Sequence, residues 1–224
     1  MVDFTPTEEQ QQLIDTIKRY AANDIEPAAH EADENEHIPS NVLKTGWDIG
    51  LIQTAIPEEF GGLGELSAVT GALAAEALAR GDLATALEVL APATFAYPVI
   101  LYGTEAQKQQ FLPPFVEDQM PKVSAALLEP GIFFDAHALK TTATVQGDQV
   151  TLDGEKAYVP LAATADHLLI YARDSASGKV DGYLVDAHNP GVTLGAREQL
   201  MGIRALPTYR VKLNNAQVGI DCRL

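Results

Sequence analysis

The sequence predicts an α+β fold: an N-terminal helical bundle domain, residues 1–120, followed by a mostly antiparallel β domain, residues 121–224. In the first half, apolar side chains recur at helical spacing behind capping residues, whereas the second half alternates apolar and polar residues between turns. The charge divides at the same place. Residues 1–120 hold 20 acidic and 5 basic side chains, and residues 121–224 hold 11 and 10.

The composition excludes some classes of protein. A formal net charge of -16 on 224 residues repels a polyphosphate backbone, which argues against general nucleic-acid binding. No apolar run approaches the roughly 18 residues that span a bilayer, and Met1 to Phe4 lack the pattern of a secretory signal. A single cysteine, Cys222, cannot form an intrachain disulfide, so the expected compartment is the cytoplasm.

The first helix is expected to be capped by Thr5, with Pro6 at its first position and Glu8 three residues after the cap. Its predicted buried face consists of Leu13, Ile14, Ile17 and Ala21. A second helical segment is expected to start at Pro27 and to end in the acidic run 31–36.

The rest of the first half contains four further predicted helices. Pro39 opens a short one that stops near Gly50, and residues 57–64 read as a loop. Alanine-rich helices over residues 67–79 and 82–90 form the expected bundle centre, because small side chains let helices approach closely. A capping box at residues 104–107 starts a last helix that breaks at Pro113-Pro114.

Strands are predicted after Met120, where the apolar period becomes two. They cover residues 141–146, 149–153, 166–173, 180–186, 192–197 and 208–213. Gly147-Asp148 is a hairpin signal, and residues 175–179 form a second turn. Because strands follow strands without intervening helices, the sheet should be mostly antiparallel.

Several motifs with known chemistry are missing. There is no nucleophile elbow, no P-loop and no dinucleotide fingerprint, and Gly61-Gly62-Leu63-Gly64 has no lysine, which favours a plain turn. His30, Glu34 and His37 have spacing that could hold a metal, but the dense acids and Pro39 favour a solvated helix end. No metal site is therefore expected. The isolated His137, His167 and His188 suit surface or core roles.

Five segments occur in a fixed order: PEEFGG (57–62), YGTEAQKQQFLPPF (102–115), EPG (129–131), DGEK (153–156) and MGIRALPT (201–208). In this order and register they resemble the acyl-CoA dehydrogenase family. The resemblance implies a helical domain, a β-barrel-like middle domain and, in the family, a C-terminal helical domain that this chain lacks. It also implies FAD as cofactor, an acyl-CoA substrate and an electron-transfer flavoprotein as acceptor. The family's catalytic base usually lies in the C-terminal region, so no catalytic residue is named here.

The resemblance also implies two flavin-facing segments. Their residues are Leu127, Leu128, Glu129, Pro130, Gly131, Phe134, Tyr158, Val159 and Pro160. Where the family has a threonine, a Gly-Ser pair and a second threonine, this chain has Leu128, Phe133-Phe134 and Pro160. These departures have two interpretations. Either the chain is a flavoprotein that tolerates the changed residues, or its flavin pocket has closed and this chain alone binds FAD poorly. Leu128 and Pro160 remove hydrogen-bond donors, and each loss costs roughly 1–3 kcal/mol if the partner stays buried.

Substrate contacts are assigned to Phe134 and Arg204, although a structural ion pair is an alternative for Arg204. Arg197, Arg210 and Lys212 could face an anionic CoA, but solvated strand faces explain them as well. An apolar face left by a missing domain predicts an oligomer.

Three functions follow as hypotheses. The chain is the N-terminal and middle part of an acyl-CoA dehydrogenase whose C-terminal helices come from a longer chain or from a partner. Alternatively, it is a non-catalytic subunit that assembles with a homologous, flavin-bearing dehydrogenase subunit. A third hypothesis is an acyl-binding or lipid-binding module without redox chemistry.

Overall fold

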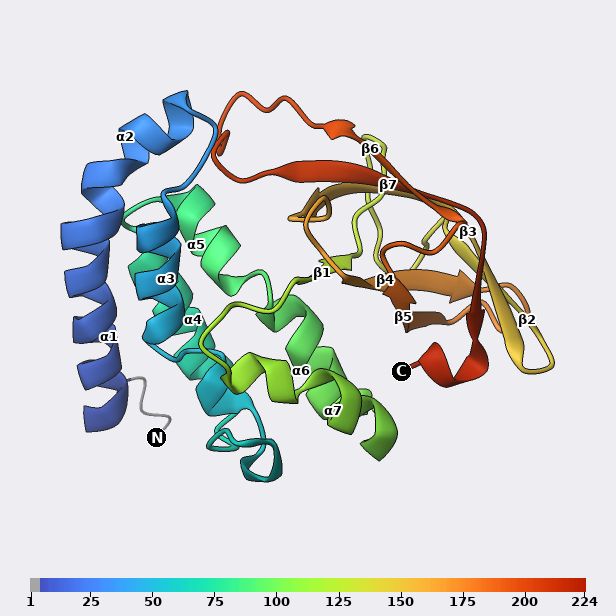
Figure 1. Cartoon of the computed structure of the whole chain (residues 1–224), viewed down its shortest axis with the longest axis horizontal. Coiled ribbons are helices and arrows are strands. Elements are labelled where there is room, and N and C mark those ends of the chain that lie inside the picture. Colours follow the sequence, from blue (N-terminus) through green and yellow to red (C-terminus); the bar gives the residue numbers. More distant parts are fainter. Residues whose placement is uncertain (1–4) are drawn as a thin grey trace. The chain divides into compact units, whose positions relative to one another are not determined.

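Helices occupy the first half of the chain and strands the second, so the α+β class expected from the sequence is confirmed (Figure 1). The computed structural model describes residues 5–224. Its α-helices are α1 (Glu8–Tyr20), α2 (Glu26–Glu34), α3 (Ser40–Asp48), α4 (Ala68–Ala79), α5 (Leu83–Leu90), α6 (Ala93–Tyr102) and α7 (Glu105–Phe111). Its strands are β1 (Val123–Ala126), β2 (Thr142–Gln146), β3 (Gln149–Pro160), β4 (His167–Asp174), β5 (Val180–Asp186), β6 (Val192–Arg197) and β7 (Thr208–Gly219).

The N-terminal helix differs from the prediction at its start. Its cap is Thr7, not Thr5: the Thr7 hydroxyl accepts a hydrogen bond from the Gln10 amide at 3.2 Å, and Gln10 Oε1 accepts one from the Thr7 amide at 3.0 Å. Pro6 and Glu8 had suggested an earlier start. The observed box uses a glutamine three residues after the cap, which satisfies the same orphan amides.

The sequence predicted a second helical segment that starts at Pro27, but the first helix continues through this residue. A π-helical turn, η1 (Ala21–Ile25), joins α1 directly to α2. Pro27 lies at the second position of α2, directly after this turn; it has no N–H to donate to the preceding turn, but its fixed φ suits the helix. The proline therefore marks a change of helical pitch instead of a new start.

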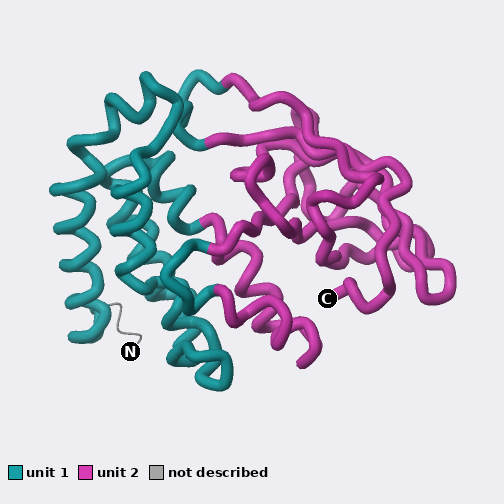
Figure 2. The backbone as a smooth tube through the Cα atoms, viewed as in Figure 1, with its two compact units in different colours: residues 1–90, 115–120, 200–206 teal, residues 91–114, 121–199, 207–224 magenta. Residues whose placement is uncertain are grey.

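Among the described residues, 5–90, 115–120 and 200–206 form one compact unit, drawn in teal in Figure 2. Within it α4 contacts both α1 and α5, and Ala74, Ala77 and Leu78 of α4 are buried. Ala205 and Leu206 join the same apolar core from far along the chain. Small side chains thus line the central helix of this unit, as predicted.

Residues 91–114, 121–199 and 207–224 form the second unit, drawn in magenta in Figure 2. Its sheet has the order β1-β4-β2-β3-β7-β6, with β5 paired to the other edge of β4. The pairs β2–β3, β3–β7, β4–β5 and β6–β7 are antiparallel, whereas β1 and β2 each pair with β4 in parallel. The prediction of a mostly antiparallel sheet is confirmed, and Gly147 makes the expected hairpin turn with a φ of 60°.

Two helices belong to this second unit. The capping box predicted at Thr104 is present, with the Gln107 amide 3.3 Å from the Thr104 hydroxyl. The Gln107 side chain is buried, and its Nε2 donates to the carbonyls of Asp221 at 2.7 Å and Arg223 at 3.0 Å. These bonds attach α7 to the C-terminal residues that follow β7.

One described stretch, Leu83–Tyr102, is by length and composition apolar enough to cross a membrane, with a mean hydropathy of 1.5. The expectation that no run approaches this length is therefore corrected. The stretch consists of α5 and α6 and contains Glu88 and two prolines, and 61% of its most apolar window is buried inside the protein. Buried core helices commonly have this composition, so the stretch is weak evidence for a membrane span.

We expect Gly154→Ala to destabilise the fold by about 2–4 kcal/mol. Gly154 has a φ of 149°, and an added Cβ would lie 2.6 Å from Thr141 Oγ1 and 2.7 Å from the Thr141 Cα. The matched control is Gly147→Ala, where the φ is also positive but no atom lies within 4 Å, and which should cost about 1–2 kcal/mol. Urea unfolding followed by circular dichroism compares them. Equal losses would contradict the steric argument.

Candidate functional site

The two segments that the sequence analysis assigned to a flavin are neighbours in the β unit. The first follows β1 and comprises residues 127–135, and the second lies near the end of β3 and comprises residues 158–160. The backbone joins them directly: the Ala157 amide donates to the Leu128 carbonyl at 2.9 Å. The chain leaves β1 beside the irregular end of β3, and this brings the two segments together.

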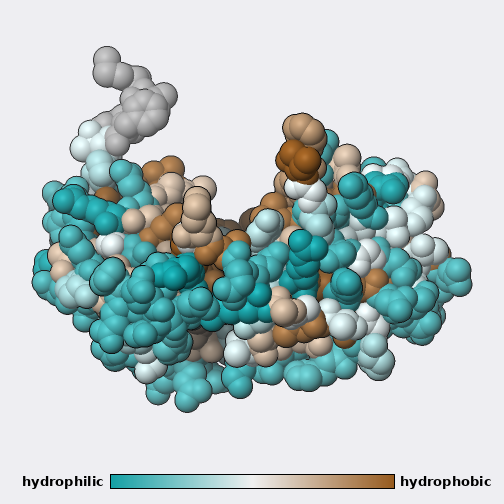
Figure 3. Space-filling model, turned by 90° about the horizontal axis from the view of Figure 1, so that it is seen from above, coloured by the Kyte–Doolittle hydropathy of each residue, from teal (hydrophilic) through white to brown (hydrophobic). Residues whose placement is uncertain are grey.

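The first segment carries apolar side chains at the surface. Ile132 is 94% exposed and Phe133 is 93% exposed, while Leu128 and Phe134 are about 40% exposed. Leu127, Glu129 and Pro130 are less accessible, and Gly131 has a φ of 150°. Figure 3 shows apolar side chains, in brown, projecting from the molecular surface. Within the β unit, Phe133 and Phe134 do not fill an interior cavity.

The second segment is strained backbone whose polar groups already have partners. Tyr158 has a φ of 54°, and its amide donates to Glu198 Oε2 at 2.8 Å. Val159 is buried and pairs with β7, and the Pro160 carbonyl accepts a hydrogen bond from the Ser124 hydroxyl at 2.6 Å. Sequence reasoning did not identify Glu198, because 40 residues separate it from Tyr158 and no local pattern joins them.

FAD presents an apolar ring face and a polar ring edge. Leu128, Phe134 and Tyr158 offer exposed apolar surface that suits a ring face. The polar edge needs hydrogen-bond donors, but the Leu128 side chain and Pro160 have none to give, and the Tyr158 amide donates to Glu198. The side chains present at these positions therefore do not fit the polar edge of a flavin.

A buried ion pair lies directly behind the two segments. Lys156 of β3 is fully buried, and its Nζ lies 2.9 Å from Glu129 Oε1 and 3.2 Å from the Leu127 carbonyl oxygen. The Glu129 carboxylate also accepts the amides of Lys140 at 2.7 Å and Thr141 at 2.8 Å. Each oxygen of the carboxylate thus has at least one donor, as a buried charge requires.

Burial by itself raises the pKa of the Glu129 carboxyl, but hydrogen bonds from Thr141, Lys140 and Lys156 outweigh it and lower the pKa from 4.5 to about 2. Burial also lowers the pKa of the Lys156 ammonium, and the adjacent Glu129 only partly offsets this effect. The Glu129 carboxylate is therefore ionised at neutral pH and is the better-satisfied member of the pair.

Arg204, expected as a substrate contact or a structural ion pair, is bonded to two acids of the helical unit. Its Nε donates to Asp33 Oδ2 at 2.9 Å, and one terminal nitrogen lies 2.7 Å from Glu34 Oε1. Hydrogen bonds from Arg204 lower the pKa of the Asp33 carboxyl. A contact between Arg204 and acyl-CoA stays a prediction.

The other basic candidates lie on the β unit. Arg210 forms ion pairs with Glu198 at 3.4 Å and with Glu155 at 3.5 Å, and Lys212 is exposed on β7. Arg197 is half-buried at the end of β6. Through these two ion pairs, Arg210 connects Glu198, whose carboxylate accepts the Tyr158 amide, with Glu155 on β3.

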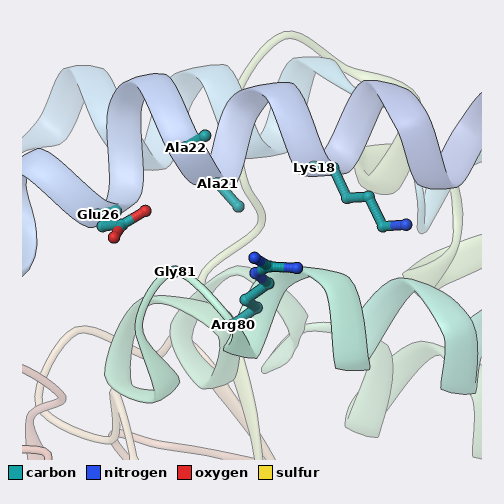
Figure 4. A pocket seen from close by; sticks show the side chains of 6 residues that line it. All are labelled: Lys18, Ala21, Ala22, Glu26, Arg80 and Gly81. Carbon is teal, nitrogen blue, oxygen red and sulfur yellow. The ribbon is translucent and has the colours of Figure 1, made fainter.

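Two grooves lie elsewhere, in the helical unit. One, of about 260 Å³, is lined by Lys18, Ala21, Ala22, Glu26, Arg80 and Gly81 (Figure 4). The other, of about 660 Å³, shares Lys18 and Arg80 and continues along α1 and α4. Neither contains a residue predicted for the site.

Among residues 5–224, His30, Glu34 and His37 belong to no cluster of three or more side chains able to hold a metal.

Comparison with known proteins places both halves of the chain in one class of flavoenzyme. The profile of the acyl-CoA dehydrogenase N-terminal domain matches residues 7–119, and that of the middle domain matches residues 124–216. The chain belongs to the acyl-CoA dehydrogenase family.

Individual relatives agree with this assignment. Cyclohex-1-ene-1-carbonyl-CoA dehydrogenase of Syntrophus aciditrophicus is 32% identical over 95% of this chain and 52% of its own length. The structure of butyryl-CoA dehydrogenase from Megasphaera elsdenii superposes with a TM-score of 0.84 at 27% identity, over all of this chain and 60% of that one. An acyl-CoA dehydrogenase from Bacillus anthracis, complexed with FAD, gives 0.78 at 28% identity over 100% of this chain and 38% of that one. The chain spans about half the length of the curated relatives it matches.

Removing either member of the buried pair should be costly. We expect Glu129→Gln and Lys156→Met each to lower the free energy of unfolding by about 3–5 kcal/mol, because each leaves a buried charge without its partner. The double variant should lose less than the sum, since no buried charge then remains. Urea unfolding of the four proteins gives the coupling energy. Strictly additive losses would show that the two residues do not act as a pair.

The stability that Glu129 contributes should depend on pH. Its folded-state pKa lies below its ordinary value, so the contribution is complete above pH 4.5 and declines as pH falls toward 2. The difference in unfolding free energy between the wild type and Glu129→Gln should therefore shrink across that window. The control is Glu155→Gln, which removes the charge of the Glu155–Arg210 ion pair at the neighbouring position of β3. The difference in unfolding free energy between this control and the wild type should be small at every pH. A Glu129 difference that stays constant would contradict the assignment.

Proposed function

We propose that this chain forms the N-terminal and middle parts of an acyl-CoA dehydrogenase assembly that removes hydrogens from the α and β carbons of an acyl-CoA thioester with FAD. The observation that supports this most strongly is the match of both domain profiles, in order, over residues 7–119 and 124–216. The relatives are nearly twice as long, so the assembly needs a further helical part. Either a longer chain or a partner subunit supplies it.

The contribution of this chain is to present a surface to the ligand. Leu128, Phe134 and Tyr158 provide apolar contact for a flat ring or an acyl group. The near-neutral charge of residues 121–224 does not repel an anionic ligand as the first 120 residues would. The catalytic base and the donors to the polar edge of the flavin come from the rest of the assembly. An electron-transfer flavoprotein as acceptor, an oligomeric state and a cytoplasmic location are parts of the same proposal.

A second candidate function is a non-catalytic subunit that assembles with a homologous, flavin-bearing dehydrogenase. The observation that favours it is the loss of donors at Leu128 and Pro160, together with the use of the Tyr158 amide by Glu198. A subunit kept for assembly would retain its fold and lose the polar contacts of its own cofactor site.

Flavin content separates the two functions. The chain is purified alone and together with a chain that carries the remaining helical part, and flavin absorbance is measured per copy of each chain. Bleaching of the flavin by an added acyl-CoA then reports dehydrogenation. One flavin per copy of this chain supports the enzyme, whereas flavin bound only in proportion to the homologous subunit supports the non-catalytic role. An assembly without flavin would contradict both.

Restoring hydrogen-bond donors should strengthen FAD binding. We expect the double variant Leu128→Thr, Pro160→Thr to bind FAD about 10-fold more tightly in the assembly, since each new donor contributes roughly 0.5–1.5 kcal/mol. The measurement is a titration of flavin fluorescence. The control is Leu194→Thr, which changes a leucine of similar exposure, 42% against 41%, on β6. An unchanged affinity in the double variant would show that these positions do not face the flavin.

A further inference from the structure

The Glu129 carboxylate closes a loop of the β unit. It accepts the amides of Lys140 and Thr141, so residues 130–139 leave and return to the same side chain. The loop carries Ile132 and Phe133, both more than nine-tenths exposed. Side chains at its tip therefore contribute little packing, and the bonds at its base determine where the loop lies.

Lys156 attaches this closed loop to β3. Its ammonium group donates to Glu129 and to the Leu127 carbonyl, which precedes the loop. The next residue, Ala157, donates its amide to the Leu128 carbonyl, and the strand then turns through the positive φ of Tyr158. One ion pair thus connects the start of the loop, its end and the strand beside it.

A buried ion pair is not the most effective way to stabilise a strand, because well-packed apolar side chains of similar volume stabilise it as well or better. An ion pair does have one property that apolar packing lacks. Its bonds are directional, so only one placement of the Glu129 backbone satisfies all three of its donors. That property is expected where a position matters more than stability.

We infer that Glu129 and Lys156 are a positioning pair, which fixes the apolar surface of residues 128–134 relative to Tyr158 for a flat, largely apolar ligand. This inference rests on the proposed function, in which these two segments face the bound ligand. Neither residue touches the ligand, because Lys156 is fully buried and Glu129 is nearly so.

The first test needs no ligand. Amide hydrogen exchange is compared in the wild type, Glu129→Gln, Lys156→Met and the double variant, which removes both charges and keeps the packing. In the double variant, which leaves no buried charge unpaired, we expect amides of residues 128–141 to exchange about 10-fold faster, and by more than those of β4 and β5, which report global stability. The matched control is Glu155→Gln, next to Lys156, which should leave the loop protected. Equal acceleration of β4 and β5, or no change in the loop, would overturn the inference.

The second test measures FAD affinity of the assembly, under conditions where circular dichroism shows each variant to be folded. We expect about 10-fold weaker binding in Lys156→Met and in the double variant, and no change in Glu105→Gln, which alters the exposed ion pair with Lys108 on α7. A mobile loop with unchanged affinity would overturn the positioning role and leave only a structural brace. If the wild-type assembly binds no FAD, the proposed function fails, and hydrogen exchange still shows whether the pair holds the loop.

Discussion

A buried ammonium group constrains this protein more than any other single group described. Lys156 lies in the middle of β3 and cannot reach water, so an ionised partner must come to it. Glu129 does so, and it also accepts two amides from the far end of its own loop. The path of the chain from β1 to β2 therefore depends on the ion pair of Lys156. The same pair determines where the exposed aromatic side chains of this loop reach the surface.

Local signals predicted the fold where local bonds determine it. The box at Thr104 and the turn at Gly147 depend on neighbouring residues and were found from the sequence. The strand β1 was not, because four short residues become a strand only by pairing in parallel with β4, more than 40 positions away. The helix α6 also gave no signal, since Pro98 lies inside it and its apolar residues face several directions.

The candidate site shows the same division. Family resemblance located residues 127–131 and 158–160, and the structure places them side by side through the bond from Ala157 to Leu128. No sequence pattern predicted that the Tyr158 amide would donate to Glu198, because that bond depends on how β6 and β7 return beside β3. Hydrogen bonds between distant residues decide which donors stay available, so a motif identifies a site without showing what the site can still bind.

The two substitutions at the positions expected to face a flavin have different consequences for the proposed function. Replacing threonine by Leu128 removes a hydroxyl, and a ligand can compensate by bonding elsewhere. Pro160 removes a backbone amide as well, which no rotamer change can restore. The apolar surface that remains at Leu128, Phe134 and Tyr158 is intact and is held by an ion pair that burial makes costly. Replacing a buried ion pair with well-packed apolar residues is often neutral or stabilising, so a protein that had lost every ligand gains little by keeping the pair. Its presence therefore favours a surface that still has something to position, whether the cofactor belongs to this chain or to its partner.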